Sequence, residues 1–302
     1  MASRRVTLVL MLLIGVAESQ AQSGGGTCGH DCLVDVMNTY LDAMVVTRDV
    51  SSVPVASSVR VTENGQVVPL GSGLFKSARA IPYRQIFADE TTGEVGLHAV
   101  AEEGGRFAVF SVRLKVVAGR IAEIDTIVAR EGQASLFAPE AMITPDPLYE
   151  QLVPADQRTP RNVMIAAANG YYEGIVHGDP SRVPAAPGCW RVENGVQTQK
   201  IPSLVLAGHC NLGHKAFAYI NPIRNRRFPL VDEARGLVWA LVIMDIKAAP
   251  AVLDANGAVV QPAREPRSIL VRELFKITAG KIRRMDVVMR DLPLGAESGW
   301  PE

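Results

Sequence analysis

The sequence predicts an α+β protein in which one design, a helix followed by a strongly bent antiparallel sheet, occurs twice. Three observations carry this prediction: residue types recur about 130 positions apart, each copy opens with helical periodicity, and strand signals joined by glycine turns follow. The 302 residues are enough for two such units. With 48% hydrophobic and 21% charged residues, the composition excludes a disordered chain.

The first 21 residues predict a signal peptide. Arg4 and Arg5 precede a mostly apolar run at 6–17, and small residues at Ser19 and Ala21 occupy the two positions that a signal peptidase reads. The run is shorter than the about 20 residues that a membrane anchor needs. A buried N-terminal helix is the alternative. We therefore expect an exported protein, secreted or periplasmic, with no membrane association once the signal is removed.

The four cysteines are Cys28, Cys32, Cys189 and Cys210. An even number in an oxidising compartment predicts two disulfides, and three pairings are open. We prefer Cys28–Cys32 with Cys189–Cys210, because each bond then stays within one half of the chain. The alternative is a zinc site that combines the last two cysteines with nearby histidines, although the short ligand spacings typical of structural zinc are missing.

The repeat is clearest around two Asn-Gly turns, where Arg60-Val61 and Glu63-Asn64-Gly65 are answered by Arg191-Val192 and Glu193-Asn194-Gly195. Farther on, the matching sets are Lys115, Gly119, Ile121 and Asp125 against Lys276, Gly280, Ile282 and Asp286. The order is kept while the offset grows, as expected when insertions fall in loops. We expect domains at 28–131 and 162–293, a Pro-rich linker at 132–161 and a tail at 294–302.

Each copy has the same local signals. Apolar residues at helical spacing predict helices over 33–46 and 163–176. Short strands at 59–62 and 189–192 lead into the Asn-Gly turns. In the first copy three longer strands follow, at 95–101, 107–117 and 120–130, and the hairpin turns are marked by Gly119 and, in the second copy, Gly280.

The motif Arg-Leu-Lys-Val-x-x-Gly-Arg-Ile-x-Glu-Ile at 113–124, after a helix and a Glu-Asn-Gly hairpin, resembles the nuclear transport factor 2-like superfamily, which includes SnoaL and ketosteroid isomerase. The stretch 226–238, with Glu273-Leu274-Phe275-Lys276 and Ser298-Gly299-Trp300, is similar to a secreted family best known from fungi, whose members carry two such domains. The resemblance implies two tandem cones, each with helices packed on a strongly curved antiparallel sheet around a mostly apolar pocket. It also implies that the cones pair as an internal pseudo-dimer, and further homo-oligomerisation stays open.

Such a pocket favours cofactor-free proton transfer, because desolvation raises the pKa of a carboxyl group. The sequence has no glycine-rich phosphate loop, nucleophile elbow or His-Glu-x-x-His motif, so nucleotide-dependent and serine-hydrolase chemistry are not expected. Equal numbers of basic and acidic residues, 31 each, argue against a nucleic-acid binder. We expect a cofactor-independent lyase or isomerase for a small hydrophobic molecule, aromatic or polyketide-like, with lignin-derived compounds included. A non-catalytic protein that binds an apolar ligand or a protein partner is the alternative.

The second copy, with its longer insertions, is the predicted active half. His209 is the first catalytic candidate, because Gly208 permits unusual backbone geometry beside it and a histidine acts as acid or base near neutral pH. Asp245 ends a very apolar strand and is a candidate base, and Tyr219 is a candidate phenol donor to a developing oxyanion. A surface histidine and a solvated acid are the structural alternatives for the first two.

Three further residues are predicted to bind substrate. Tyr172 is a second phenol donor, and Arg224 belongs to a basic cluster suited to a substrate carboxylate. Arg191 lies beside the turn with Glu193. Arg60 and Glu63 repeat this pair in the first copy, so a salt bridge or turn contact is the alternative for both. No metal and no cofactor is expected.

Overall fold

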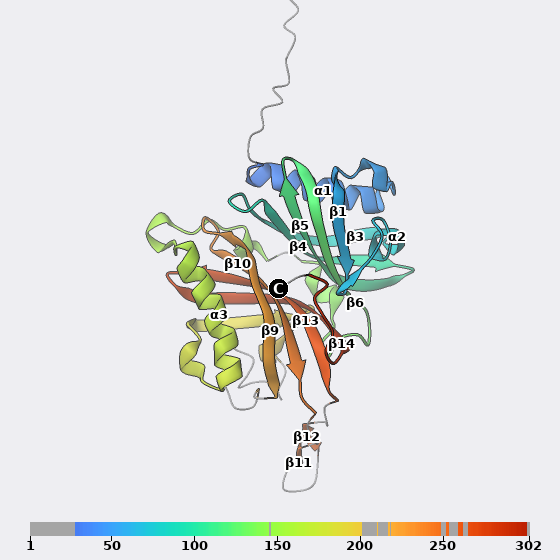
Figure 1. Ribbon diagram of the computed structural model, residues 1–302. Coiled ribbons are helices and arrows are strands. Elements are labelled where there is room, and N and C mark those ends of the chain that lie inside the picture. Colours follow the sequence, from blue (N-terminus) through green and yellow to red (C-terminus); the bar gives the residue numbers. More distant parts are fainter. Residues whose placement is uncertain are drawn as a thin grey trace, which may run out of the picture.

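The computed structural model of the protein describes residues 28–144, 146–200, 210, 217, 219–248, 252–253, 259–261 and 265–300. Strands dominate these residues, which form two six-stranded sheets and a short two-stranded ribbon (Figure 1). Each large sheet contains strands from one half of the chain only, so the two sequence copies correspond to the two sheets.

The first half contains helices α1 (His30–Val45) and α2 (Leu74–Ser77) and strands β1 (Val55–Glu63), β2 (Gln66–Val67), β3 (Ala80–Asp89), β4 (Glu94–Glu103), β5 (Arg106–Val117) and β6 (Arg120–Ala129). The second half contains α3 (Arg161–His177) and β7 (Ala185–Glu193), β8 (Val196–Gln197), β9 (Ile220–Asp232), β10 (Leu237–Ile246), β13 (Arg267–Thr278) and β14 (Lys281–Pro293). The ribbon is β11 (Val252–Leu253) and β12 (Val259–Gln261). Short 3-10 turns lie at Val50–Ser52, Pro139–Met142, Pro147–Tyr149, Ala155–Gln157, Pro180–Arg182 and Thr198–Lys200.

The strand order is β2-β1-β6-β5-β4-β3 in the first sheet and β8-β7-β14-β13-β10-β9 in the second. Both sheets are mixed, because β1 pairs with β6, and β7 with β14, in parallel, while the other neighbours are antiparallel. The two sheets therefore have the same topology, and each strand of the first sheet has a counterpart at the same place in the second.

Matching hydrogen bonds fix which residues of the two halves correspond. The amide of Asn64 donates to the carbonyl of Thr126 at 2.8 Å, and the amide of Asn194 donates to that of Val287 at 2.9 Å. Toward the other end of the sheets, Val116 bonds to Gly93 as Ile277 bonds to Gly236. Thr126 therefore corresponds to Val287, and Val116 to Ile277.

The strand registers extend this correspondence to the first strand of each sheet. Val61 pairs with Ile124 in the first sheet, and Arg191 pairs with Met285 in the second. Ile124 and Met285 are equivalent, so Val61 is the counterpart of Arg191. The sequence match that set Arg191 against Arg60 is one residue out of register.

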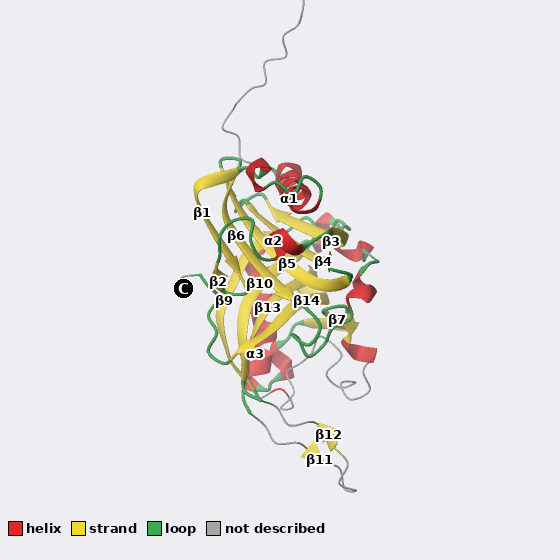
Figure 2. Cartoon of the chain, turned by 90° about the vertical axis from the view of Figure 1, so that its right-hand side faces the viewer, coloured by secondary structure: helices red, strands yellow, loops and turns green. Residues whose placement is uncertain are grey.

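Two helices cover the outer faces of the two sheets (Figure 2). The apolar face of α1, with Leu33, Met37 and Leu41, packs on the first sheet, and that of α3, with Met164 and Tyr172, packs on the second. The opposite faces of the sheets pack on each other through Val109, Ile127, Ile243, Leu270 and Val288. The core of the described residues thus has four clusters, one under each helix and two between the sheets.

The predicted fold class is wrong. In place of two cones with helices packed on strongly curved antiparallel sheets, forming an internal pseudo-dimer, the described residues form mostly two mixed six-stranded sheets with three α-helices, one of them four residues long. The parallel pair escaped prediction because the chain passes through four further strands between β1 and β6. The hairpin glycines reveal only pairings between neighbouring strands.

Several local predictions are confirmed. Helices α1 and α3 cover the two periodic segments, and Asn64-Gly65 and Asn194-Gly195 form the turns with positive φ. The disulfides are Cys28–Cys32 and Cys189–Cys210, so the last two sulfurs are not zinc ligands. Disulfides are typical of proteins in oxidising compartments. None of the helices described is long and apolar enough to span a membrane.

Candidate functional site

A carboxyl group lies inside the apolar core beneath α3. Glu273 is in the middle of β13 and 1% exposed. Because side chains alternate along a strand, it shares a face with Val271 and Phe275, which belong to the cluster that packs on α3. An ionised carboxylate is costly in such surroundings unless polar groups compensate it.

The hydroxyl of Tyr172 compensates the carboxyl directly, since Oη donates to Oε2 of Glu273 at 2.8 Å. Tyr172 is fully buried on α3. Burial raises the pKa of Glu273 to about 8, against the opposing effects of the Tyr172 hydrogen bond and the positive charge of Arg191. The carboxyl therefore exchanges its proton close to neutral pH, where a group serves as acid and as base.

A buried guanidinium is the third member of this cluster. Arg191, on β7, is 2% exposed, and its Nε donates to Oε1 of Glu193 at 2.5 Å. Its charge also acts on Glu273 and on Tyr171, whose ring packs edge-on against Tyr172 at 5.3 Å. We call Tyr172, Arg191 and Glu273 the acid cluster.

Toward the surface the acid cluster meets a second set of polar groups. The guanidinium of Arg226 lies 5.8 Å from the centre of the Tyr172 ring and pairs with Glu173, the next residue of α3. Glu173 in turn contacts His177 at 3.1 Å, and that histidine side chain is about half exposed. Polar side chains thus continue from the buried phenol to the exposed end of the helix.

The first half of the chain has no acid cluster at the equivalent positions. Val61 is the counterpart of Arg191, and counting back from the matched pair Val116 and Ile277 places Val112 opposite Glu273. In the helices, the repeat that matches Tyr40 with Tyr171 places Leu41 opposite Tyr172. The same sheet and helix therefore form with three apolar residues, and the fold does not require the acid cluster.

The structure brings together two of the residues predicted from sequence, Tyr172 and Arg191. Tyr219 packs at the edge of the same core, with its ring 6.0 Å from that of Phe217. His209 lies outside the described residues.

Asp245 and Arg224 bind each other. Nε of Arg224 donates to Oδ2 of Asp245 at 2.9 Å, and Ser268 donates to Oδ1 at 2.6 Å. Burial raises the pKa of Asp245, but these hydrogen bonds outweigh it and hold the pKa below its usual value. Asp245 is therefore ionised and engaged at the end of β10.

Glu273 was missed by the sequence analysis. It lies in the run Ser268-Ile269-Leu270-Val271-Arg272-Glu273-Leu274-Phe275. Because Arg272 and Glu273 are adjacent charged residues, the sequence suggests that both are exposed to solvent. The repeat held the missing signal, because Lys276 matches Lys115 and a count of three residues back sets Glu273 against Val112. An acid opposite a core valine marks a buried position.

A cavity of about 320 Å³ lies on the other face of the second sheet. Leu274 lines it, whereas its neighbour Glu273 points the opposite way toward α3. The remaining walls come from β3 and β4 of the first sheet, from the segment 141–147 and from β7, β8 and β14. The cavity and the acid cluster are therefore two separate features on opposite faces of β13.

Comparison with known proteins gives a family without an assigned activity. No curated protein shows significant similarity to the chain. A family model described as a domain of unknown function (DUF8021) matches residues 29–128 and 157–289. These two matched segments contain the two sheets almost entirely, and together they span most of the chain. The chain therefore belongs to the DUF8021 family.

Proposed function

We propose that this protein is an exported, cofactor-independent lyase or isomerase that acts by acid–base chemistry on a small hydrophobic molecule, aromatic or polyketide-like. The observation that carries the proposal is the hydrogen bond between Tyr172 and Glu273 at positions where the first half has Leu41 and Val112. A buried acid that the fold does not need, with a pKa of about 8, has the properties of a general acid or base.

The simplest reaction for these groups is a proton shift next to a carbonyl. The carboxylate of Glu273 takes a proton from the carbon beside the carbonyl, and the electron pair moves onto the carbonyl oxygen. As Glu273 becomes protonated, the Tyr172 hydroxyl turns away from its Oε2 and donates a hydrogen bond to this developing enolate. The protonated Glu273 then returns the proton to another carbon, so the substrate is isomerised and no electrons are gained or lost. In a lyase reaction Glu273 instead takes the proton of a hydroxyl on the β carbon, and the O–H electron pair forms a new carbonyl as the C–C bond breaks to leave an enolate. The protonated Glu273 then returns the proton to the enolate carbon.

Export is supported by the first 21 residues and by the two disulfides. An oxidising compartment keeps both bonds formed, and one of them ties Cys189 of β7, two residues before Arg191, to Cys210.

The test uses protein with both disulfides intact, incubated with aromatic dimers, steroids and polyketides, with consumption followed by mass spectrometry. E273Q keeps the shape of the side chain and removes the exchangeable proton, so turnover is expected to fall at least about 100-fold, the contribution typical of a general acid or base. Y172F is expected to lower kcat with less effect on KM.

The decisive variant replaces the acid cluster by its counterparts in the first half, as Y172L/R191V/E273V. Apolar residues in place of a buried ionic network are often neutral or stabilising, so this protein is expected to fold and to lose turnover. The control is E193Q alone, which keeps Glu273 and Tyr172. Full activity in the triple variant would exclude the acid cluster as the catalytic group.

The second candidate function is binding without catalysis of a small ligand, and the cavity between the sheets favours it. Its volume of about 320 Å³ lies at the lower end of the range of small-molecule sites. A compound that binds and is recovered unchanged, with affinity unaffected by E273Q, is the outcome expected of a carrier.

A further inference from the structure

The cavity between the sheets has a counterpart in the first half, and there it is occupied by a side chain of the protein itself. Trp300 lies beside the first sheet, and its Nε1–H donates to Oγ1 of Thr62 at 3.1 Å. Two guanidinium groups flank the ring, with the Cζ of Arg60 at 5.1 Å and that of Arg113 at 5.5 Å from its centre. The indole thus packs against guanidinium groups of both β1 and β5.

The backbone around Trp300 fits closely against the Asn-Gly turn. A Cβ on Gly65 would lie 2.2 Å from the carbonyl oxygen of Glu297, and Gly299 approaches the carbonyl of Gly65 in the same way. The tail after β14 is therefore docked in one position on the first half.

The residues that correspond to this Trp300 site all line the cavity in the second half. By the register of β1 and β7, Arg60 and Thr62 correspond to Trp190 and Val192, and the matched turn sets Gly65 against Gly195. Arg113 corresponds to Leu274, one residue after the pair Val112 and Glu273. The four counterparts, Trp190, Val192, Gly195 and Leu274, line the cavity.

The segment after β6 approaches the second half as the tail approaches the first. A Cβ on Gly195 would lie 2.1 Å from the carbonyl oxygen of Ala138, just as Gly65 meets Glu297. Trp300 comes three residues after Glu297, and Ala141 comes three residues after Ala138. Ala141 lines the cavity, so the residue at the same distance along this segment carries a methyl group where the tail carries an indole.

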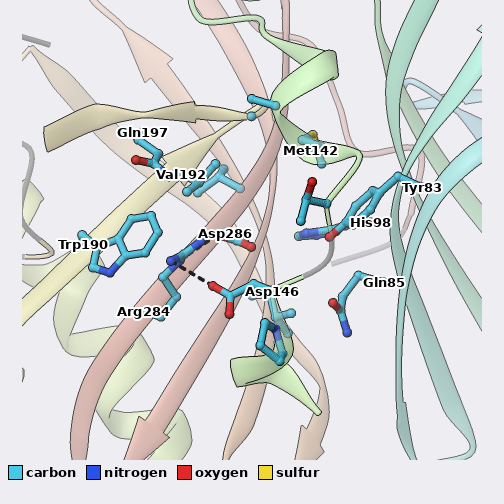
Figure 3. Close-up of a pocket in the computed structure, with 16 residues that line it drawn as sticks. Tyr83, Gln85, His98, Met142, Asp146, Trp190, Val192, Gln197, Arg284 and Asp286 are labelled. Carbon is cyan, nitrogen blue, oxygen red and sulfur yellow. Dashed lines mark hydrogen bonds and ion pairs between the residues drawn. The ribbon is translucent and has the colours of Figure 1, made fainter. Parts of the chain in front are cut away.

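The polar groups of the cavity indicate which ligand replaces the indole (Figure 3). Arg284 is held between two carboxylates, with Nη1 3.0 Å from Asp146 and Nε 3.1 Å from Asp286. Trp190 lies against that guanidinium, and Tyr83 with His98 stand on the opposite side of the cavity. Aromatic faces and carboxylate oxygens together suit a flat ring that carries an N–H or O–H donor.

We propose that this cavity is a binding site for a planar aromatic molecule of one or two rings with an N–H or phenolic O–H group, held in the place that Trp300 occupies in the first half. The site is independent of the acid cluster, because it lies on the other face of β13 and shares no residue with it.

The test measures binding of two probes, indole and 2-naphthol, by calorimetry and ligand-observed NMR. Wild-type protein is expected to bind one molecule per chain, with a Kd of about 10 μM to 1 mM for ligands of this size. A141W places an indole at the position equivalent to Trp300 and is expected to weaken binding at least about tenfold. I143W is the matched control, because Ile143 is an exposed residue of the same segment that does not line the cavity.

Q197W fills the cavity from β8 and tests the same point should A141W not fold. D286N removes one acceptor charge and is expected to weaken the phenol more than a ring without a donor, such as naphthalene. W300A reopens the site in the first half and is expected to raise the stoichiometry for indole from one to two.

Absence of indole and naphthol binding to the wild type, or equal affinity in A141W and I143W, would overturn the proposal. E273Q separates this site from the proposed activity, since it is expected to leave probe affinity unchanged. Loss of turnover with intact probe binding assigns the chemistry to the acid cluster, whereas loss of both in E273Q contradicts the independence of the two sites.

Discussion

Arg272 of β13 and Asp125 of β6 form an ion pair that joins the two halves of the chain, with Nη2 2.8 Å from Oδ2. Both side chains are almost fully buried, and Thr62 donates a further hydrogen bond to Oδ1 of Asp125 at 3.0 Å. Arg227 approaches the same carboxylate at 3.6 Å. One carboxylate therefore neutralises two guanidinium groups between the sheets.

D125N is expected to destabilise the protein by about 3–5 kcal/mol, because it leaves the buried Arg272 without a counter-charge. The free energy of unfolding from urea titration measures this. E131Q is the control, since the pair of Arg106 and Glu131 is exposed and 3.6 Å apart, and such pairs contribute less than about 1 kcal/mol. A loss of stability in D125N no larger than in E131Q contradicts the assignment.

The contribution of Glu273 to the free energy of unfolding is expected to depend on pH. Its pKa is raised from 4.5 to about 8 in the folded chain, mainly by burial. Between these values the folded protein holds a proton that the unfolded chain releases, so stability falls as pH rises, by at most about 1.4 kcal/mol per pH unit. Urea titrations of the wild type and E273Q at pH 5 and pH 7.5 measure the effect. The wild type is expected to lose more stability than E273Q over this interval, and parallel losses argue against a protonated Glu273.

His98 is expected to make the protein sensitive to acid. It is buried between the sheets, and its Nε2 accepts a hydrogen bond from Nε1 of Trp239 at 3.1 Å. Burial, aided by the charge of Arg272, lowers its pKa from 6.5 to about 3. Between these pH values the imidazole is protonated in the unfolded chain and neutral in the folded chain. The free energy of unfolding therefore falls as pH drops from about 6.5 toward 3.

H98Q keeps an acceptor for Trp239 and removes the titrating ring, so it is expected to lose less stability than the wild type between pH 6.5 and 4.5. H98F removes the acceptor as well and is expected to cost about 1–3 kcal/mol at neutral pH, because the indole N–H is left unpaired. Thermal melts over the pH range measure both. Identical acid sensitivity in the wild type and H98Q would falsify this prediction.

The docking of the tail is expected to depend on Gly65. G65A places a methyl group against the carbonyl of Glu297. Gly119 also has a positive φ, but a methyl group there would meet no other atom, so G119A is the control. Both variants have a cost of about 1 kcal/mol from the left-handed backbone. Only G65A is expected to release the tail, which limited proteolysis with mass spectrometry detects as faster cleavage after residue 293. Equal cleavage rates in the two variants exclude close docking at Gly65.

Local features were predictable from the sequence because they depend on neighbours along the chain. The periodicity of α1 and α3 and the Asn-Gly turns need only short-range information. The disulfide preference followed from keeping each bond in one half, and Cys189 does pair with Cys210.

Features that depend on distant strands were not predictable in the same way. The parallel pairing of β1 with β6 joins Val61 to Ile124 across four intervening strands, and no local pattern records it. The acid cluster was missed for the same reason, because the register of β7 is not recorded locally. Matching Arg191 with Arg60 suggested that Arg191 and Glu193 form a surface pair present in both halves. The strand register sets Arg191 against Val61, a partly buried residue that packs against the core beneath α1.

The place of Trp300 has a consequence for how the chain matures. Ribosomes deliver residues 28–129 long before residue 300, so all the strands of the first sheet exist while the surface formed by Arg60, Thr62 and Arg113 still lacks its indole. The half that is synthesised first is therefore completed last. A nascent chain halted within the linker lacks the indole that packs on Arg60 and Arg113, so the last residues of the protein to be made complete a contact of the first sheet.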